Sequence, residues 1–172
     1  MQPTWYPFLL LTGLILIITI HVGRQAPNWL IRLKRLSLLA FLWILTAFCY
    51  TPTAYDFGSN VVLHYIQWGP VKLILNPFRH LDIEFWLNVV LTMPLGFLLG
   101  WNFPHYSWRR IIVLGLITGL SLETGQFILD WLVHLNRWVE VDDVLTNWAG
   151  VIIGFGSFQL LSRLPGGRWL KN

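Results

Sequence analysis

The sequence predicts an all-α integral membrane protein, a helical bundle of about five transmembrane helices with short interfacial or re-entrant helices on its outer face. Hydrophobic residues make up 55% of the 172 residues and charged residues only 12%, which is about half the charged share of a soluble domain. The apolar residues are also gathered in long runs, as membrane spans require. This composition excludes a disordered chain, and the single cysteine, Cys49, excludes a disulfide scaffold.

Five apolar runs are predicted to cross the membrane, at residues 5–22, 36–51, 85–103, 111–131 and 144–164. A helix needs about 20 apolar residues to cross the hydrocarbon layer, so the short second run is expected to extend into its flanks. No Lys or Arg precedes the first run and no small-x-small cleavage site follows it. We therefore expect a retained span and not a cleaved signal peptide, with residues 1–172 forming one membrane domain.

The segment 52–83, between the second and third runs, contains two shorter apolar pieces. They are separated by Gly69-Pro70, and the second is followed by Asn76-Pro77. Neither piece is long enough to cross the bilayer, so both are predicted to lie on the outer face as interfacial or re-entrant helices.

The charged residues are divided between the two sides of the predicted membrane protein. Seven of the eight acidic residues lie on or near one side, and the eighth, Glu123, lies inside the fourth run. The positive-inside rule places the basic side in the cytoplasm, with the N-terminus outside and the C-terminus inside. The net charge of +4 is thus explained by topology, and no nucleic-acid partner is expected. Nine of the 12 basic residues mark the cytoplasmic side: Arg24, Arg32, Lys34, Arg35, Arg109, Arg110, Arg163, Arg168 and Lys171.

Small residues spaced four apart occur in each of the last three runs. Such pairs let two helix backbones approach closely where no hydrophobic driving force exists. The last three helices are therefore predicted to form the packed core, with the first two around it. The pairs are Gly96/Gly100, Gly115/Gly119 and Gly150/Gly154.

Polar residues form a stripe on each of these three helices, in the outer third of the bilayer. An ionisable residue inside a span is costly and is by default a functional candidate. If the stripes face one another, they form a polar pocket that opens to the outer surface. At about 100° per residue, the stripes are Glu84, Asn88 and Thr92, then Gly119, Glu123, Gln126 and Asp130, then Asp143, Asn147, Gly150 and Gly154.

Three interpretations of these polar residues are open. They can be structural hydrogen-bonding groups, with Glu123 bonded to Asn147 or Arg137. They can line a ligand pocket with Arg137, Asp142 and Asp143 at its rim, where an arginine fork grips phosphate or carboxylate. The carboxylates, with Asp130, can also hold a divalent cation, but no recognised ligand spacing is present, so neither a metal nor a cofactor is predicted.

The order of several motifs is similar to that of the VanZ-like family of small bacterial membrane proteins. The resemblance covers about residues 74–156, and the chain departs from the family pattern at Gly125 and Trp148. The motifs are Asn76-Pro77-Phe78-Arg79, Asn88, Met93-Pro94-Leu95-Gly96-Phe97, Ser121-Leu122-Glu123-Thr124-Gly125-Gln126, Arg137, and Val141-Asp142-Asp143-Val144-Leu145-Thr146-Asn147-Trp148-Ala149-Gly150 with Gly154.

The resemblance implies a multi-pass protein of the bacterial plasma membrane that lowers susceptibility to teicoplanin, a lipid-bearing glycopeptide. We hypothesise non-enzymatic binding of an envelope lipid, a lipid-linked polymer or the lipoglycopeptide itself at the outer leaflet. The candidate ligand-binding residues are Arg79, Asn88, Glu123, Gln126, Arg137, Asp142, Asp143 and Asn147.

Two alternatives belong to other functional classes. One is an integral-membrane enzyme that acts on a lipid phosphate or glycolipid, with Glu123 and Asp143 as acid/base groups or metal ligands. The sequence contains no G-x-S-x-G, H-E-x-x-H or P-loop motif, so binding is favoured over catalysis. The other is a small transporter, for which the chain shows no internal repeat. The oligomeric state is left open.

Overall fold

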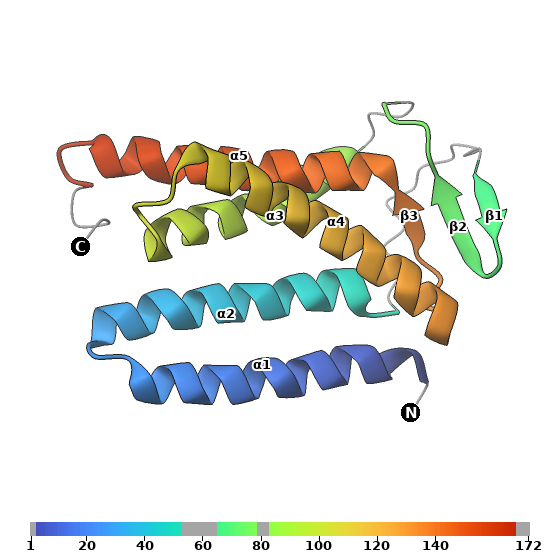
Figure 1. Ribbon diagram of the computed structural model, residues 1–172, viewed down its shortest axis with the longest axis horizontal. Helices are drawn as coiled ribbons and strands as arrows, with labels where there is room; N and C mark the ends of the chain where they lie inside the picture. Colours follow the sequence, from blue (N-terminus) through green and yellow to red (C-terminus); the bar gives the residue numbers. More distant parts are fainter. Residues whose placement is uncertain (1–2, 53–64, 79–82, 168–172) are drawn as a thin grey trace.

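The computed structural model describes residues 3–52, 65–78 and 83–167, and Figure 1 shows how their helices and strands are arranged. Five helices are long and apolar enough to cross a membrane, which confirms the predicted helical membrane bundle. A single turn of 3-10 helix, Pro3–Trp5, precedes the first of them. The five helices are α1 (Tyr6–Gln25), α2 (Trp29–Tyr50), α3 (Ile83–Asn102), α4 (Trp108–Val133) and α5 (Val141–Arg163).

Four of the five helices begin earlier than their apolar runs, and polar residues cap two of these starts. The side chain of Asn28 accepts a hydrogen bond of 2.8 Å from the backbone N–H of Ile31, so α2 begins at Trp29 and reaches a membrane-spanning length. Ser107 likewise accepts from the N–H of Arg110 at the start of α4. The predicted second and fourth runs are therefore too short at their N-terminal ends.

The centre of the bundle is α5, which packs along α3 and against α4. Gly154 lies against the backbone carbonyl of Met93, and Gly150 lies against that of Val89. On the facing helix, Gly96 lies against the carbonyl of Val151. These contacts confirm the prediction that the glycine pairs bring the helix backbones together.

The remaining helices pack around this centre. A buried apolar cluster joins α2 to the last three helices and consists of Leu45, Leu95, Ile111, Val151 and Phe155. The first helix packs mainly on α2, and Figure 1 shows the two as an antiparallel pair on one side of the bundle. Residues of α1 are not buried within the chain, as expected for a span that faces lipid.

In residues 65–78, the chain forms strands and not the predicted interfacial or re-entrant helices, while residues 53–64 and 79–82 of the outer segment lie outside the described residues. Strand β1 (Ile66–Trp68) pairs antiparallel with β2 (Val71–Ile74), and β2 pairs in parallel with β3 (Trp138–Glu140). Gly69, at φ +59°, occupies the first position of the two-residue turn between β1 and β2, a position that favours glycine. The prediction of helices was wrong because β2 gains a partner, β3, that comes from the connection between α4 and α5.

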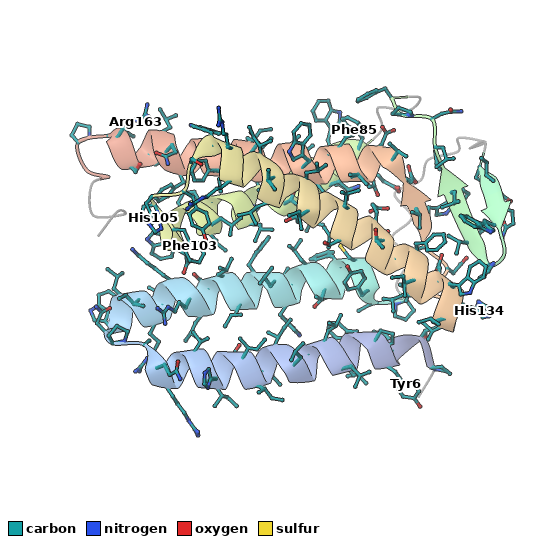
Figure 2. The ribbon with its side chains drawn as sticks, viewed as in Figure 1. Tyr6, Phe85, Phe103, His105, His134 and Arg163 are labelled. Carbon is teal, nitrogen blue, oxygen red and sulfur yellow. The ribbon has the colours of Figure 1, made fainter. Side chains whose placement is uncertain are left out.

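The bundle thus has two chemically different ends. We call the end with the three strands the sheet end, and the end with the α1–α2 and α3–α4 connections and the C-terminus of α5 the basic end. Figure 2 shows His134 at the sheet end and His105 and Arg163 at the basic end. In the described part of the chain, no acidic residue lies in either connection at the basic end or after α5. The predicted separation of charge is therefore present, while its orientation in a membrane stays a prediction.

Candidate functional site

The polar residues of the last three helices are buried, in spite of the cost of removing them from water. Each of the three helices contributes, and Asp130 is only 1% exposed. These residues lie in the half of the bundle nearer the sheet end, where α5 begins and α4 ends. We call them the polar cluster. Its buried members are Thr92 on α3, Glu123, Gln126 and Asp130 on α4, and Asp142, Thr146 and Asn147 on α5.

The contact between α3 and α5 connects two candidate residues directly. The amide nitrogen of Asn88 donates a hydrogen bond of 2.6 Å to the carboxylate of Asp143. One turn further along α3, the hydroxyl of Thr92 donates to the backbone oxygen of Asn147 at 2.9 Å. Gly150 lies beside Thr92, so the close helix approach permits these bonds. The predicted alignment of the α3 and α5 stripes is therefore present.

Glu123 lies within α4 and is 5% exposed. Its carboxylate accepts a hydrogen bond of 3.1 Å from the backbone N–H of Glu140, in β3. This partner differs from Asn147 and Arg137, the two partners considered from the sequence. The carboxyl groups of Glu123 and Asp143 also lie within electrostatic range of each other. Two acidic groups are thus held near one another inside the bundle.

Arg137 joins α2 to the connection that follows α4. Its Nη2 donates to the backbone oxygens of Phe48 (2.8 Å) and Thr51 (3.2 Å), at the C-terminal end of α2. Its backbone N–H donates to both carboxylate oxygens of Asp130. A cation at the C-terminal end of a helix is stabilised by the helix dipole. Arg137 therefore has a structural role in addition to any role in binding.

Asp142 holds the chain that follows β2. Both of its carboxylate oxygens accept from the backbone N–H of Phe78, at 3.0 and 3.1 Å. Phe78 has φ +60°, a strained conformation for a residue with a side chain, so this double acceptor stabilises an unfavourable backbone. The next residue, Arg79, was also a candidate and lies outside the described residues.

Within the part of the chain that the structure describes, three buried polar atoms in or next to the polar cluster have no hydrogen-bond partner. They are the side-chain oxygens of Gln126 and Asn147 and the Nε of Arg137. The other end of the Gln126 amide makes only a long bond, 3.5 Å, to the backbone oxygen of Cys49. Leaving such a group unpaired costs about 1–3 kcal/mol. Two acceptors and one donor are thus available for a bound molecule or for ordered water.

The four carboxylates considered as cation ligands are held by separate partners. Asp130 accepts from Arg137, Asp142 from Phe78, Glu123 from Glu140 and Asp143 from Asn88. Across residues 3–52, 65–78 and 83–167, no three His, Cys, Asp or Glu side chains form a group that could hold a metal ion. The geometry therefore does not favour the divalent-cation interpretation.

The sheet end also carries an aromatic cluster. The rings of Trp68 and Phe127 are 5.7 Å apart, those of Phe127 and Trp131 are 6.2 Å apart, and Tyr65 contacts Trp138 at 5.1 Å. Trp68 and Trp131 are largely exposed, as expected of rings at headgroup level. The hairpin turn at Gly69-Pro70 was the sequence signal that could have placed Trp68 on a strand next to α4.

Comparisons with known proteins give one family. The family model described as VanZ/LLP1 matches residues 35–162, which include most of α2, all of α3 and α4, and α5 except its last residue. The match is longer than the region of resemblance recognised from the motifs, and it leaves α1 outside. No curated protein and no solved structure matches the chain.

Proposed function

The chain belongs to the VanZ/LLP1 family, and from this premise we propose that it lowers susceptibility to lipid-bearing glycopeptide antibiotics such as teicoplanin. In this proposal the protein lies in the bacterial plasma membrane with its sheet end outside. There it binds an envelope lipid, a lipid-linked polymer or the drug itself, without chemical change. The polar cluster is the binding site.

The observation that carries this proposal is the set of unpartnered polar atoms in and next to the polar cluster. Gln126 and Asn147 each leave an oxygen acceptor, and Arg137 leaves a nitrogen donor. Sugar hydroxyls and peptide amides both donate and accept hydrogen bonds, and lipid-linked polymers and lipoglycopeptides contain such groups. All three atoms are buried, so a ligand reaches them only if the surrounding elements separate locally. Binding is therefore expected to involve a conformational change.

The placement at the outer leaflet is supported by the two ends of the bundle. Basic residues gather at the end opposite the strands, which the positive-inside rule assigns to the cytoplasm. The aromatic cluster lies at the sheet end, where amphipathic rings favour the headgroup region. A ligand with a polar head and an apolar tail meets the polar cluster and the lipid-facing helices together in this arrangement.

Two substitutions separate binding from a purely structural role. Asn147→Leu and Gln126→Met replace amides whose oxygens are unpartnered with apolar side chains of similar size, and within the described residues only the long 3.5 Å bond from Gln126 to Cys49 is lost. Such replacements are nearly neutral or stabilising when little hydrogen bonding is lost. We expect both variants to melt at the wild-type temperature or above it. In teicoplanin susceptibility assays at equal expression, both should resemble a strain without the protein.

The matched controls are Ser157→Ala on α5 and Thr118→Val on α4. Each removes a hydroxyl that bonds only within its own helix, to Gly154 and Leu114 respectively, away from the cluster. Both controls should keep wild-type resistance. Wild-type resistance in Asn147→Leu and Gln126→Met as well would contradict the proposal and would assign the unpartnered atoms to ordered water.

A second candidate function is an enzyme acting on a lipid phosphate or glycolipid. It is favoured by one observation, the electrostatic interaction of the buried Glu123 with the partly buried Asp143, which Asn88 orients through a hydrogen bond of 2.6 Å. Purified protein incubated with envelope lipids would then give a product detectable by mass spectrometry, and Glu123→Gln would not. Unmodified lipids, with and without a chelator, would favour binding over catalysis.

A further inference from the structure

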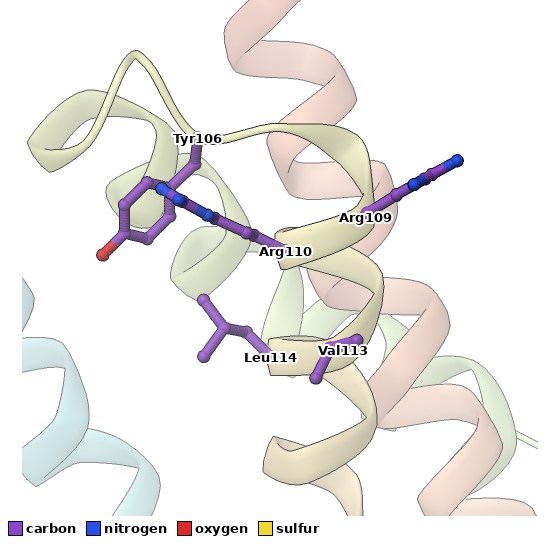
Figure 3. A pocket seen from close by; sticks show the side chains of 5 residues that line it. All are labelled: Tyr106, Arg109, Arg110, Val113 and Leu114. Carbon is purple, nitrogen blue, oxygen red and sulfur yellow. The ribbon is translucent and has the colours of Figure 1, made fainter.

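A pocket lies at the basic end, far from the polar cluster. It has a volume of about 430 Å³ and is lined by residues of the α3–α4 connection and of the first two turns of α4. Figure 3 shows the side chain of Arg110 extending toward Tyr106, while Arg109 extends from another side of the helix. The pocket combines two guanidinium groups with an apolar wall. Its lining residues are Tyr106, Arg109, Arg110, Val113 and Leu114.

The charge of this pocket is not compensated within the described chain. The acidic residues in 3–52, 65–78 and 83–167 are Glu84, Glu123, Asp130, Glu140, Asp142 and Asp143, and none lies on the first three turns of α4 or in the connection before it. The N-terminus of α4 adds the positive end of its helix dipole. An anion is therefore the complementary ligand.

The geometry of Arg110 favours an anionic group with two oxygen acceptors. Its guanidinium carbon lies 5.5 Å from the centre of the Tyr106 ring, within the range of a cation–π contact. Such a contact orients the guanidinium and lowers the entropy lost when it binds an anion. Arginine binds phosphate through two parallel hydrogen bonds, so a phosphate group fits this side chain.

The apolar part of the pocket continues along α4 into the membrane-spanning region. Val113 is 55% exposed and Ile117, one turn further on, is 52% exposed. Leu120 follows on the same side and is also exposed. This row of side chains leads from the two arginines toward the middle of the bilayer. A ligand with an acyl chain attached to its anionic head would contact both regions.

We propose that this pocket binds one anionic phospholipid of the leaflet that surrounds the basic end. Arg110 holds the phosphate, Arg109 adds positive charge from another side of the same helix end (Figure 3), and an acyl chain lies along Val113 and Ile117. The pocket volume is that of a small-molecule site, sufficient for the headgroup and the beginning of the chains. Basic pockets at the cytoplasmic side of membrane helices bind lipid headgroups in this way. The site is independent of the proposed role in drug susceptibility.

Native mass spectrometry of the full chain tests this proposal. The protein is released from micelles that contain equal amounts of phosphatidylcholine and phosphatidylglycerol, and the ratio of the two bound lipids is measured. The wild type should retain phosphatidylglycerol preferentially. In the double variant Arg109→Gln/Arg110→Gln, the ratio of bound phosphatidylglycerol to bound phosphatidylcholine should fall about 30-fold, as expected for the removal of two cations near an anionic surface.

The matched control is Arg32→Gln/Arg35→Gln, which removes the same charge from exposed residues of α2 at the same end. The control should keep the preference, and thermal melting by circular dichroism should show both variants folded. An equal loss in both variants would overturn the proposal in favour of diffuse attraction. An unchanged preference in the pocket variant would overturn it directly.

Inorganic phosphate distinguishes a lipid site from a simple anion site. We expect millimolar phosphate to leave phosphatidylglycerol bound, because the acyl chain contributes to affinity through Val113 and Ile117. Complete displacement by phosphate, or equal retention of a short-chain phosphatidylglycerol, would show that only the anionic group is recognised and would overturn the proposal of a lipid site.

Discussion

Replacing Gly154 by alanine is expected to weaken the bundle at its centre. A Cβ at this position would overlap the backbone carbonyl oxygen of Met93 on α3. Non-bonded carbon and oxygen atoms approach to roughly 3.3 Å, so the two helices would have to separate locally by about 1.5 Å. The obstacle is backbone within a helix, so a side-chain rotation cannot relieve the overlap.

The size of the expected loss in the free energy of unfolding follows from this geometry. Overpacking a well-packed core costs about 1–3 kcal/mol, and the rigid obstacle places Gly154→Ala near the upper limit. A matched control lies two residues away on the same helix. A Cβ on Gly156 would meet only a ring atom of Trp108 at 3.5 Å, so Gly156→Ala should gain up to about 1 kcal/mol from helix propensity. The two variants should therefore differ by about 3–4 kcal/mol.

Equilibrium unfolding in mixed micelles with increasing dodecyl sulfate, followed by circular dichroism, measures this difference. Gly154→Ala should unfold at a lower detergent fraction than wild type, and Gly156→Ala at the same or a higher fraction. Equal stability of the two alanine variants would refute the reasoning, because it would show that the backbones of α3 and α5 do not meet at Gly154.

Three further predictions concern the sheet end and the orientation of the chain. Asp130→Ala should lower the free energy of unfolding by about 1–3 kcal/mol because it leaves the Arg137 N–H without its acceptor, whereas Asp130→Asn keeps an oxygen there and should cost less. Both values can be measured by the same unfolding assay, and equal effects would count against this role. Gly69→Ala should accelerate hydrogen exchange in β1 and β2 about tenfold, because alanine is strained at φ +59° and would press on the Trp131 ring. The control is Gly13→Ala, which has open space around its Cβ and should leave the exchange rates unchanged. The proposed orientation places the C-terminus in the cytoplasm. A green fluorescent protein fused after residue 172 should therefore fluoresce, and an alkaline phosphatase fused there should be inactive. The reverse result would invert the proposed orientation.

The helices could be predicted from the sequence because the bilayer thickness sets the length of an apolar run. Their starts were less predictable, since Asn28 and Ser107 extend α2 and α4 by capping them. Periodicity also indicated which faces would be buried. Glu123, Gln126 and Asp130 are all buried on one side of α4, as their spacing predicts.

The partners of these side chains could not be predicted in the same way. The acceptor role of Glu123 depends on a backbone N–H of β3, and no sequence pattern near Glu123 indicates that strand. The sheet itself needs a pairing between residues 71–74 and 138–140. These residues are distant in the chain, so their pairing depends on the packing of the helices that connect them. Whether the cluster binds a ligand stays a prediction.

The central claim is that the unpartnered atoms of Gln126 and Asn147 bind a polar molecule from the envelope. Mass spectrometry of the small molecules that co-purify in mild detergent tests it most directly, with wild type and Asn147→Leu prepared from the same host. We expect at least one lipid or lipid-linked glycan that the wild type retains and Asn147→Leu loses, while any phospholipid at the basic end stays in both. Identical contents in the two preparations, even when teicoplanin is added, would contradict the account.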